Sequence, residues 1–127
     1  MTQTLDRLKT FGWRWGPALA LMAVIYWASA TPSRNLPDFG GWDTLLKKGG
    51  HALGYALLAA AYQHGLRGRP ALAVLLAGLY ALTDEFHQTF TAGRTPSGLD
   101  VLIDTTGAIV GAWLWWAGRA GWAARRR

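Results

Sequence analysis

Polar side chains, most of them ionisable, occur in three short stretches of the sequence, at spacings that would place them on one face of a helix. Spacings of three or four residues recur among them, and the residues are Lys48, His51 and Tyr55, then Asp84, Glu85 and Gln88, then Asp100 and Asp104. Arg94 lies between the second stretch and the third, and its planar guanidinium suits a phosphate or a carboxylate. These side chains, together with Arg94, form the expected ligand-binding set of a single polar site.

The same stretches also allow enzymatic chemistry. A carboxylate beside another carboxylate can act as a general acid or base, and the candidates for that role are Asp84, Glu85 and His51. Imidazole and carboxylate groups also suit a divalent metal, for which the candidate ligands are His51, Asp84, His87 and Asp100. The sequence has no His-Glu-x-x-His pattern and no cysteine, and Ser97 is interpreted as a loop or helix-capping residue rather than a nucleophile. Whether the protein is an enzyme, and whether it holds a metal, is left open.

The elements that must position these residues are predicted from the distribution of charge. Only 16% of the 127 residues are charged and 51% are hydrophobic, whereas an average soluble domain carries roughly 25% charged residues. Charge-free stretches cover 15–33, 49–66, 70–83 and 105–118, separated by segments rich in proline and glycine. We predict an all-α polytopic membrane protein: one domain over 1–127, with four transmembrane helices at about 13–31, 45–66, 70–90 and 98–118.

The basic residues predict the orientation of this bundle. With a cytoplasmic N-terminus, nine of the 13 basic residues fall on the cytoplasmic side, as the positive-inside rule requires. Both termini are then cytoplasmic, in the cell membrane, and all acidic residues except Asp6 lie on the opposite side. The net charge of +6 is therefore interpreted as a topology signal, and nucleic acid is not an expected partner.

The short charge-free stretches of the last two helices predict a recessed site. They are shorter than the ~20 apolar residues that a helix needs to cross the hydrocarbon core. Asp84, Glu85 and Asp104 would then lie below the headgroups, where a carboxylate is costly unless it is paired or hydrated. The expected partners are Arg94, Lys48 and His51, in a water-accessible pocket that opens outward.

Two further patterns concern helix packing. Ala77 and Ala81 continue the face of Asp84 and Gln88, so this face is expected to pack inward. Gly50-xxx-Gly54 and Gly107-xxx-Gly111 match the small-residue motif of closely packed membrane helices.

The polar residues also resemble a known family. The block Asp84-Glu85-x-His87-Gln88-x-Phe90-x-x-Gly93-Arg94-x-x-Ser97-x-x-Asp100, together with Lys48, His51, Tyr55, Gly107 and Gly111, resembles the VanZ-like family of small membrane proteins. The resemblance covers about 45–115. Two positions depart from the family pattern: Ala52 replaces an aromatic residue that often follows the histidine, and Asp104 replaces an amide.

The resemblance implies a role at the cell envelope. The family is named after a protein of glycopeptide-resistance clusters that lowers sensitivity to teicoplanin, a glycopeptide with a lipid tail. Many relatives lie outside such clusters, so antibiotic resistance does not follow for this chain. We expect an extracytoplasmic polar pocket that binds the head group of a lipid-linked envelope molecule or a lipoglycopeptide. The alternative is a membrane-embedded hydrolase or transferase, metal- or acid/base-dependent, acting on a lipid-linked phosphate or glycan. Ion-coupled transport is disfavoured because the acidic residues lie on one side only.

Overall fold

The computed structural model describes residues 2–126, which form four α-helices joined by short loops. The helices are α1 (Thr2–Ala30), α2 (Asp43–Gly65), α3 (Pro70–Gln88) and α4 (Gly98–Ala124). Two 3-10 turns, Ser33–Asn35 and Gly40–Trp42, lie in the connection between α1 and α2. No β-strand occurs within the described range. The prediction of an all-α protein with four helices is confirmed, although α1 begins eleven residues before the expected helix at 13–31 and α4 ends beyond the expected 118.

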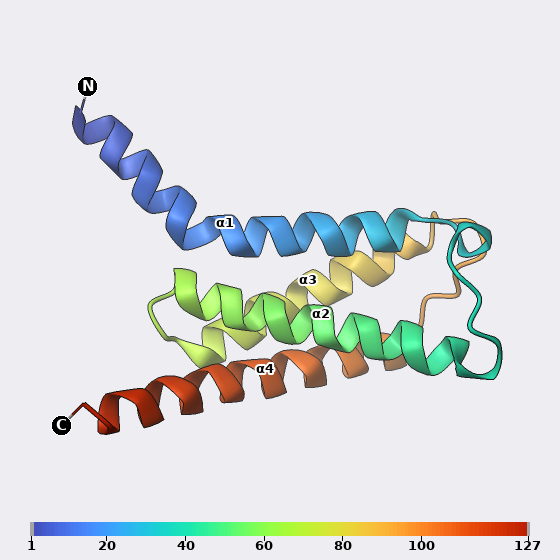
Figure 1. Cartoon of the computed structure of the whole chain (residues 1–127). Helices are drawn as coiled ribbons and strands as arrows, with labels where there is room; N and C mark the ends of the chain where they lie inside the picture. Colours follow the sequence, from blue (N-terminus) through green and yellow to red (C-terminus); the bar gives the residue numbers. More distant parts are fainter. Residues whose placement is uncertain (1, 127) are drawn as a thin grey trace.

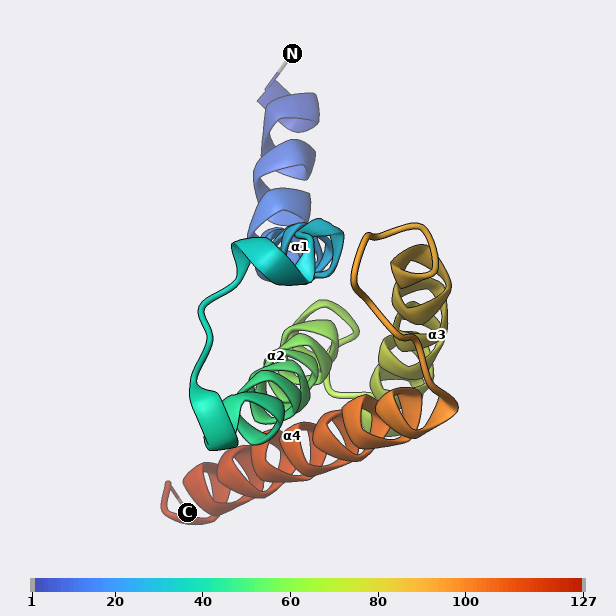
Figure 2. The same cartoon turned by 90° about the vertical axis from the view of Figure 1, so that its right-hand side faces the viewer.

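The helices run lengthwise beside one another, so the bundle has two distinct ends (Figure 1). The two termini and the short α2–α3 turn lie at one end, and the longer loops 31–42 and 89–97 lie at the other (Figure 1). Seen from the end with the longer loops, α2 lies between α1 and α4, with α3 beside it (Figure 2). In this order α2 packs against each of the other three helices.

The α2–α4 contact is the closest in the bundle because α4 carries glycine where it crosses α2. A Cβ added to Gly107 would overlap the carbonyl oxygen of Ala52, and one added to Gly111 would overlap that of Ala56. The backbones of the two helices therefore touch, as expected for a small-residue motif. The pair Gly50-xxx-Gly54 does not form such a contact. Gly54 faces the side chain of Ile25 in α1, and Gly50 has open space around it.

A buried face of α3 completes the core. Ala73, Ala77 and Ala81 are at most 1% exposed, and the same face continues into Asp84 and Gln88, which are also buried. The expectation that this face packs inward is confirmed. Small side chains on α3 let the larger Tyr55 and Leu58 of α2 fill the centre, and both are fully buried.

Helix α1 is bent, and a proline explains where. Pro17 lies inside the helix and has no N–H to donate to the carbonyl of Trp13, so one hydrogen bond of the helix is missing. The ring Nε2 of His64 in α2 lies 3.2 Å from the carbonyl oxygen of Trp13, so a side-chain contact replaces the missing backbone hydrogen bond. Arg14 donates to the carbonyl oxygen of Gly65, 2.5 Å away. The first part of α1 consequently leaves the bundle at an angle (Figure 1).

The outer faces of the helices are largely apolar. Exposed tryptophans include Trp13, Trp27, Trp42 and Trp113, each at least 60% exposed. Within 2–126, α4 is the one helix whose length and apolar composition meet the criteria for a membrane span.

Candidate functional site

A cavity of about 260 Å³ opens at the end of the bundle that carries the longer loops. Residues from α2, α3, α4 and both loops contribute to its lining. The lining consists of Ser33, Asp43, Thr44, Lys47, Lys48, His51, Glu85, Gln88, Gly93, Arg94, Thr95, Asp100, Ile103 and Asp104. Seven of the side chains expected from the sequence therefore meet around one cavity: Lys48, His51, Glu85, Gln88, Arg94, Asp100 and Asp104.

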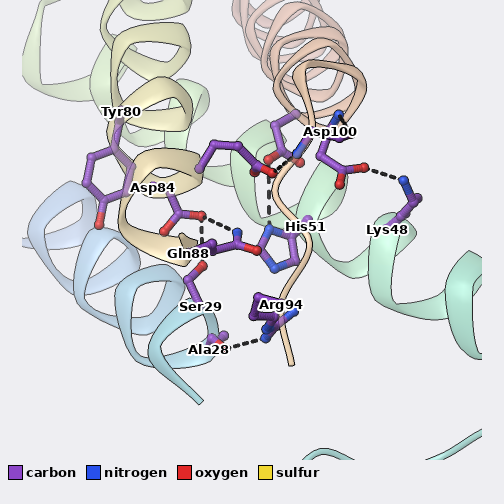
Figure 3. A network of polar contacts seen from close by, with 12 residues as sticks. Ala28, Ser29, Lys48, His51, Tyr80, Asp84, Gln88, Arg94 and Asp100 are labelled. Atoms are coloured by element: carbon purple, nitrogen blue, oxygen red, sulfur yellow. Dashed lines mark hydrogen bonds and ion pairs between the residues drawn. The ribbon is translucent and has the colours of Figure 1, made fainter. Parts of the chain in front are cut away.

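One wall of the cavity is formed by α2 and α4, which are held in register by their glycine contact. The ammonium of Lys48 forms an ion pair with the carboxylate of Asp100 across the two helices (Figure 3). One turn deeper, Nδ1 of His51 lies 3.8 Å from Oδ2 of Asp104, whose side chain is only 3% exposed. Each carboxylate of α4 in this wall thus faces a nitrogen-bearing side chain of α2.

The opposite wall is formed by the end of α3 and the loop 89–97. Glu85 accepts a hydrogen bond of 2.5 Å from the backbone N–H of Ser97. The hydroxyl of Ser97 in turn accepts a bond of 3.3 Å from the N–H of Asp100 and caps the N-terminus of α4. The interpretation of Ser97 as a capping residue is confirmed, and Glu85 fixes the point where the loop enters α4.

Arg94 fastens this loop to α1. Its Nη2 donates to the carbonyl oxygen of Ala28 at 2.7 Å and its Nε to that of Thr31 at 3.4 Å (Figure 3). The last carbonyls of a helix lack partners within the helix, so a guanidinium satisfies them well. Gly93 precedes it with a φ of +74°, a left-handed conformation that favours glycine. The expectation that Arg94 pairs with a buried carboxylate is wrong: within 2–126 it forms no ion pair.

Asp84 lies behind the cavity rather than in its lining. Its side chain accepts hydrogen bonds from the hydroxyl of Ser29 at 2.7 Å and from the amide of Gln88 at 3.3 Å (Figure 3). Tyr55 is also fully buried, and its hydroxyl has no hydrogen-bond partner among the described residues. These two members of the expected ligand-binding set are therefore separated from the cavity, with Gln88 lining it in front of Asp84.

The four expected metal ligands do not converge. The ring of His87 stacks on Tyr26, with 4.5 Å between the ring centroids, while Asp84 faces Ser29 and Asp100 faces Lys48. Across the part of the chain that the structure describes, no group of three or more His, Cys, Asp or Glu side chains is arranged to hold a metal ion. The structure therefore does not bring His51, Asp84, His87 and Asp100 together, because three of them contact separate neighbours.

Some residues that line the cavity were not predicted from the sequence. Asp43 and Lys47 form an ion pair of 2.7 Å at the start of α2, and the hydrogen bond from Lys47 lowers the pKa of Asp43. Their spacing of four residues was a usable signal, since such pairs lie on one helix face. Ser33 carried no such signal: its hydroxyl donates to the carbonyl oxygen of Gly93 at 2.5 Å and joins the two loops.

Some charged side chains around the cavity face a side chain of opposite charge, and others bind only neutral groups. Asp43, Asp100 and Asp104 each face a basic side chain. Arg94 is bound to neutral carbonyl oxygens and Glu85 to a neutral N–H, so neither charge is balanced by an opposite charge within 2–126. The cavity can therefore receive an acidic group beside Arg94 and a hydrogen-bond donor beside Glu85.

Comparison with known proteins identifies the family of this chain. No curated protein and no solved structure matches it. A family model described as VanZ/LLP1 matches residues 15–119, which include α2 and α3, the larger parts of α1 and α4, and every residue that lines the cavity. The chain belongs to the VanZ/LLP1 family of membrane-associated proteins.

Proposed function

We propose that the protein crosses the membrane four times as a single domain over 1–127, with both termini in the cytoplasm. The apolar outer faces of the bundle support this topology, because helix surfaces that contact lipid do not need polar side chains. Exposed Trp13 near one end and Trp27 and Trp42 near the other suit the two membrane interfaces. A tag at the C-terminus of the protein in intact cells is expected to resist membrane-impermeant labels, and labelling from outside would overturn the orientation.

We propose further that the cavity binds the head group of an amphiphile on the extracytoplasmic side, as a VanZ-type function. The candidate ligands are a lipid-linked envelope molecule and a lipoglycopeptide such as teicoplanin, which share an acidic head group and an apolar chain. One observation carries the proposal: a charged cavity, in which Arg94 and Glu85 pair with no opposite charge among residues 2–126, lies at the end of a bundle whose flanks are apolar. An acidic group would bind the guanidinium of Arg94, where charge-assisted hydrogen bonds are strongest.

The test compares two arginines that fasten α1 in the same way. Arg94→Gln removes the guanidinium at the cavity, and Arg14→Gln removes one that also donates to a backbone carbonyl, but at the other end. Binding of polyprenyl phosphate and of teicoplanin is measured on each purified variant in phosphatidylcholine nanodiscs. We expect Arg94→Gln to weaken binding of at least one of these probes by about tenfold or more, because it removes the charged donor.

The matched variant decides whether that loss reports on the cavity. Arg14→Gln is expected to bind as the parent protein does. Equal losses in the two variants would mean that α1 attachment, rather than the cavity, controls binding. His51→Gln provides a second cavity variant if Arg94→Gln does not fold. If neither probe binds the parent protein, and no amphiphile is found by mass spectrometry of its lipid extract, the proposal fails.

One contact favours the alternative of a hydrolase or transferase. His51 and the buried Asp104 both line the cavity and face each other, which is the arrangement of a general base with an orienting carboxylate. The other two catalytic candidates fit less well, because Asp84 lies outside the lining and Glu85 is bound to the N–H of Ser97. Incubation with polyprenyl pyrophosphate would separate the two functions: release of phosphate that is lost in His51→Gln would establish catalysis.

A further inference from the structure

An apolar groove lies next to the polar cavity, further along the bundle. It has a volume of about 520 Å³ and lies between α2 and α4. Ala52, Leu53 and Ala56 form one side, and Ile103, Gly107 and Val110 contribute to the other. Ile103 lines both the groove and the polar cavity, and Ala52 directly follows the cavity residue His51. The polar and apolar spaces therefore adjoin each other at Ile103 along the same pair of helices.

The groove owes its shape to the glycine contact. Because Gly107 has no side chain, the backbones of α2 and α4 touch there and form a floor between the larger side chains on each side. Leu53 and Val110 stand at the rim and are 61% and 48% exposed. The volume falls within the range of roughly 300–1,000 Å³ that is usual for ligand sites.

The direction of the groove matches the direction of an amphiphile in a bilayer. Both α2 and α4 run from the cavity end toward the end with the termini (Figure 1). Groove residues follow cavity residues along both helices, and at about 1.5 Å per residue the stretch from 102 to 110 covers about 12 Å. A molecule with its head group in the cavity would therefore direct its chain toward the membrane centre.

We propose that the α2–α4 groove holds the first part of the hydrocarbon chain of the ligand whose head group occupies the cavity. This inference rests on the proposed function and adds the ligand class: a single-chain or prenyl lipid with an acidic head group. The chain gains apolar contact with Leu53 and Val110, while the acidic group binds at Arg94. Specificity then arises from both parts, since a head group without a chain or a chain without a head group fills only half of the site.

The chain offers a matched pair of variants for the test. Val110 faces the α2–α4 groove, and its neighbour Ile109 faces another apolar groove of about 500 Å³ between α3 and α4. The two residues are similarly exposed, 48% and 53%, and the second groove shares no residue with the polar cavity. Val110→Trp would fill the first groove and Ile109→Trp the second, with the same added indole in each.

The experiment uses a polyprenyl phosphate that carries a diazirine in its first isoprene units, and the corresponding polyprenol as the probe without an acidic head. The full-length protein in phosphatidylcholine nanodiscs is irradiated with each probe, and the labelled residues are mapped by tandem mass spectrometry. We expect the phosphate probe to label 52–56 and 102–110. Labelling should fall about tenfold in Val110→Trp, the change expected when a chain loses a few buried methylene contacts, and should persist in Ile109→Trp.

Each result decides between the two proposals. Labelling near 93–95 without labelling of the groove would overturn this inference and leave head-group binding intact. Equal labelling of both grooves, or equal labelling by polyprenol, would mean ordinary lipid contact and would also overturn it. If the phosphate probe labels neither the cavity nor the groove, both the inference and the proposed function fail.

Discussion

The two walls of the polar cavity are built in different ways. On one side, α2 and α4 are held by direct backbone contact at Gly107 and Gly111, so their relative position is set by shape. On the other side, α1, the end of α3 and the loop 89–97 are joined by hydrogen bonds from a few side chains, above all Arg94 and Ser29. Close packing resists small displacements, whereas a few hydrogen bonds can open and reform.

This difference indicates which wall can adapt to a ligand. The α2–α4 wall carries Lys48, His51, Asp100 and Asp104 in fixed register, and it is continuous with the apolar groove. The wall with Arg94 can move only if its bonds to the carbonyls of α1 break. The acidic group of the proposed ligand would compete for the same guanidinium, which would couple ligand binding to the attachment of α1. The predictions below test the contrast between a packed wall and a hydrogen-bonded one.

The largest effect is expected at the packed wall. Gly111→Leu places a side chain where the backbone of Ala56 lies, so α2 and α4 must separate. We expect a loss of about 3 kcal/mol or more in the free energy of unfolding, at the upper end for overpacking, or no folded protein at all. Gly118→Leu is the control, because a Cβ there meets nothing within 4 Å. Thermal unfolding in detergent measures both, and equal stability of the two variants would show that close packing does not hold this wall.

A smaller effect is expected when the hydrogen-bonded wall is released. Arg94→Gln removes two hydrogen bonds from a charged donor to the end of α1, and bonds of this kind contribute roughly 1.5–3 kcal/mol. We expect a loss of about 2 kcal/mol and faster hydrogen exchange in α1, with exchange in α2 and α4 unchanged. If α2 and α4 lose protection to the same extent, the two walls are not independent.

Ser29→Ala tests the same wall at a single contact. The hydroxyl donates 2.7 Å to the buried carboxylate of Asp84, and its removal leaves that carboxylate with the amide of Gln88 alone. A buried polar group that loses a partner costs about 1–3 kcal/mol, and we expect the lower part of this range because one donor remains. Thr31→Ala serves as the control, since its hydroxyl bonds only to the backbone of its own segment. A Ser29 variant as stable as the control would show that Asp84 does not depend on α1.

The ion pair across the mouth of the cavity is expected to contribute least to the packed wall. Lys48 and Asp100 remain 37% and 28% exposed, and pairs of this exposure contribute up to about 1 kcal/mol. Lys48→Met should therefore lower stability by less than about 1 kcal/mol, and the difference should vanish in 1 M salt, where the Debye length is about 3 Å. A large, salt-independent loss would mean that charge rather than packing positions α2 against α4.

The pair of Asp43 and Lys47 at the start of α2 should show the smallest effect and a defined pH dependence. Because the bond from Lys47 lowers the pKa of Asp43 in the folded protein, its contribution is present above the ordinary aspartate pKa of 3.8 and is lost as pH falls through the lowered value. Lys47→Met should thus change the unfolding midpoint only marginally at neutral pH, and by progressively less as the pH falls below 3.8. A clear difference that persists in acid would contradict this origin.

The sequence was sufficient for the packed parts of the fold. Charge-free stretches between proline- and glycine-rich segments indicated four helices, and Gly107-xxx-Gly111 indicated a close helix contact. Periodicity also indicated the buried face of α3, because Ala77 and Ala81 are four positions apart and continue the face of Asp84 and Gln88. These features depend on local spacing, which a single sequence displays directly.

The hydrogen-bonded parts could not be predicted in the same way. The distribution of charges suggested a carboxylate partner for Arg94, but its partners are backbone carbonyls. Every residue has a backbone carbonyl, so such a partner cannot be identified from residue types. The partner of Asp84 is Ser29, a neutral residue in a different helix. His87 appeared in the same motif as Asp84, yet its ring stacks on Tyr26, while Asp84 accepts a hydrogen bond from Ser29 about one turn further along α1.

The attachment of α1 also has a consequence for the order in which the molecule is made. Ser29 and Asp84 are separated by 55 positions, Arg94 and Ala28 by 66, and Arg14 and Gly65 by 51. In a growing chain the first helix therefore emerges long before the groups that hold its far end. Its far end gains these hydrogen bonds only after Asp84 and Arg94 have been translated, and a chain terminated before Asp84 would lack both of them.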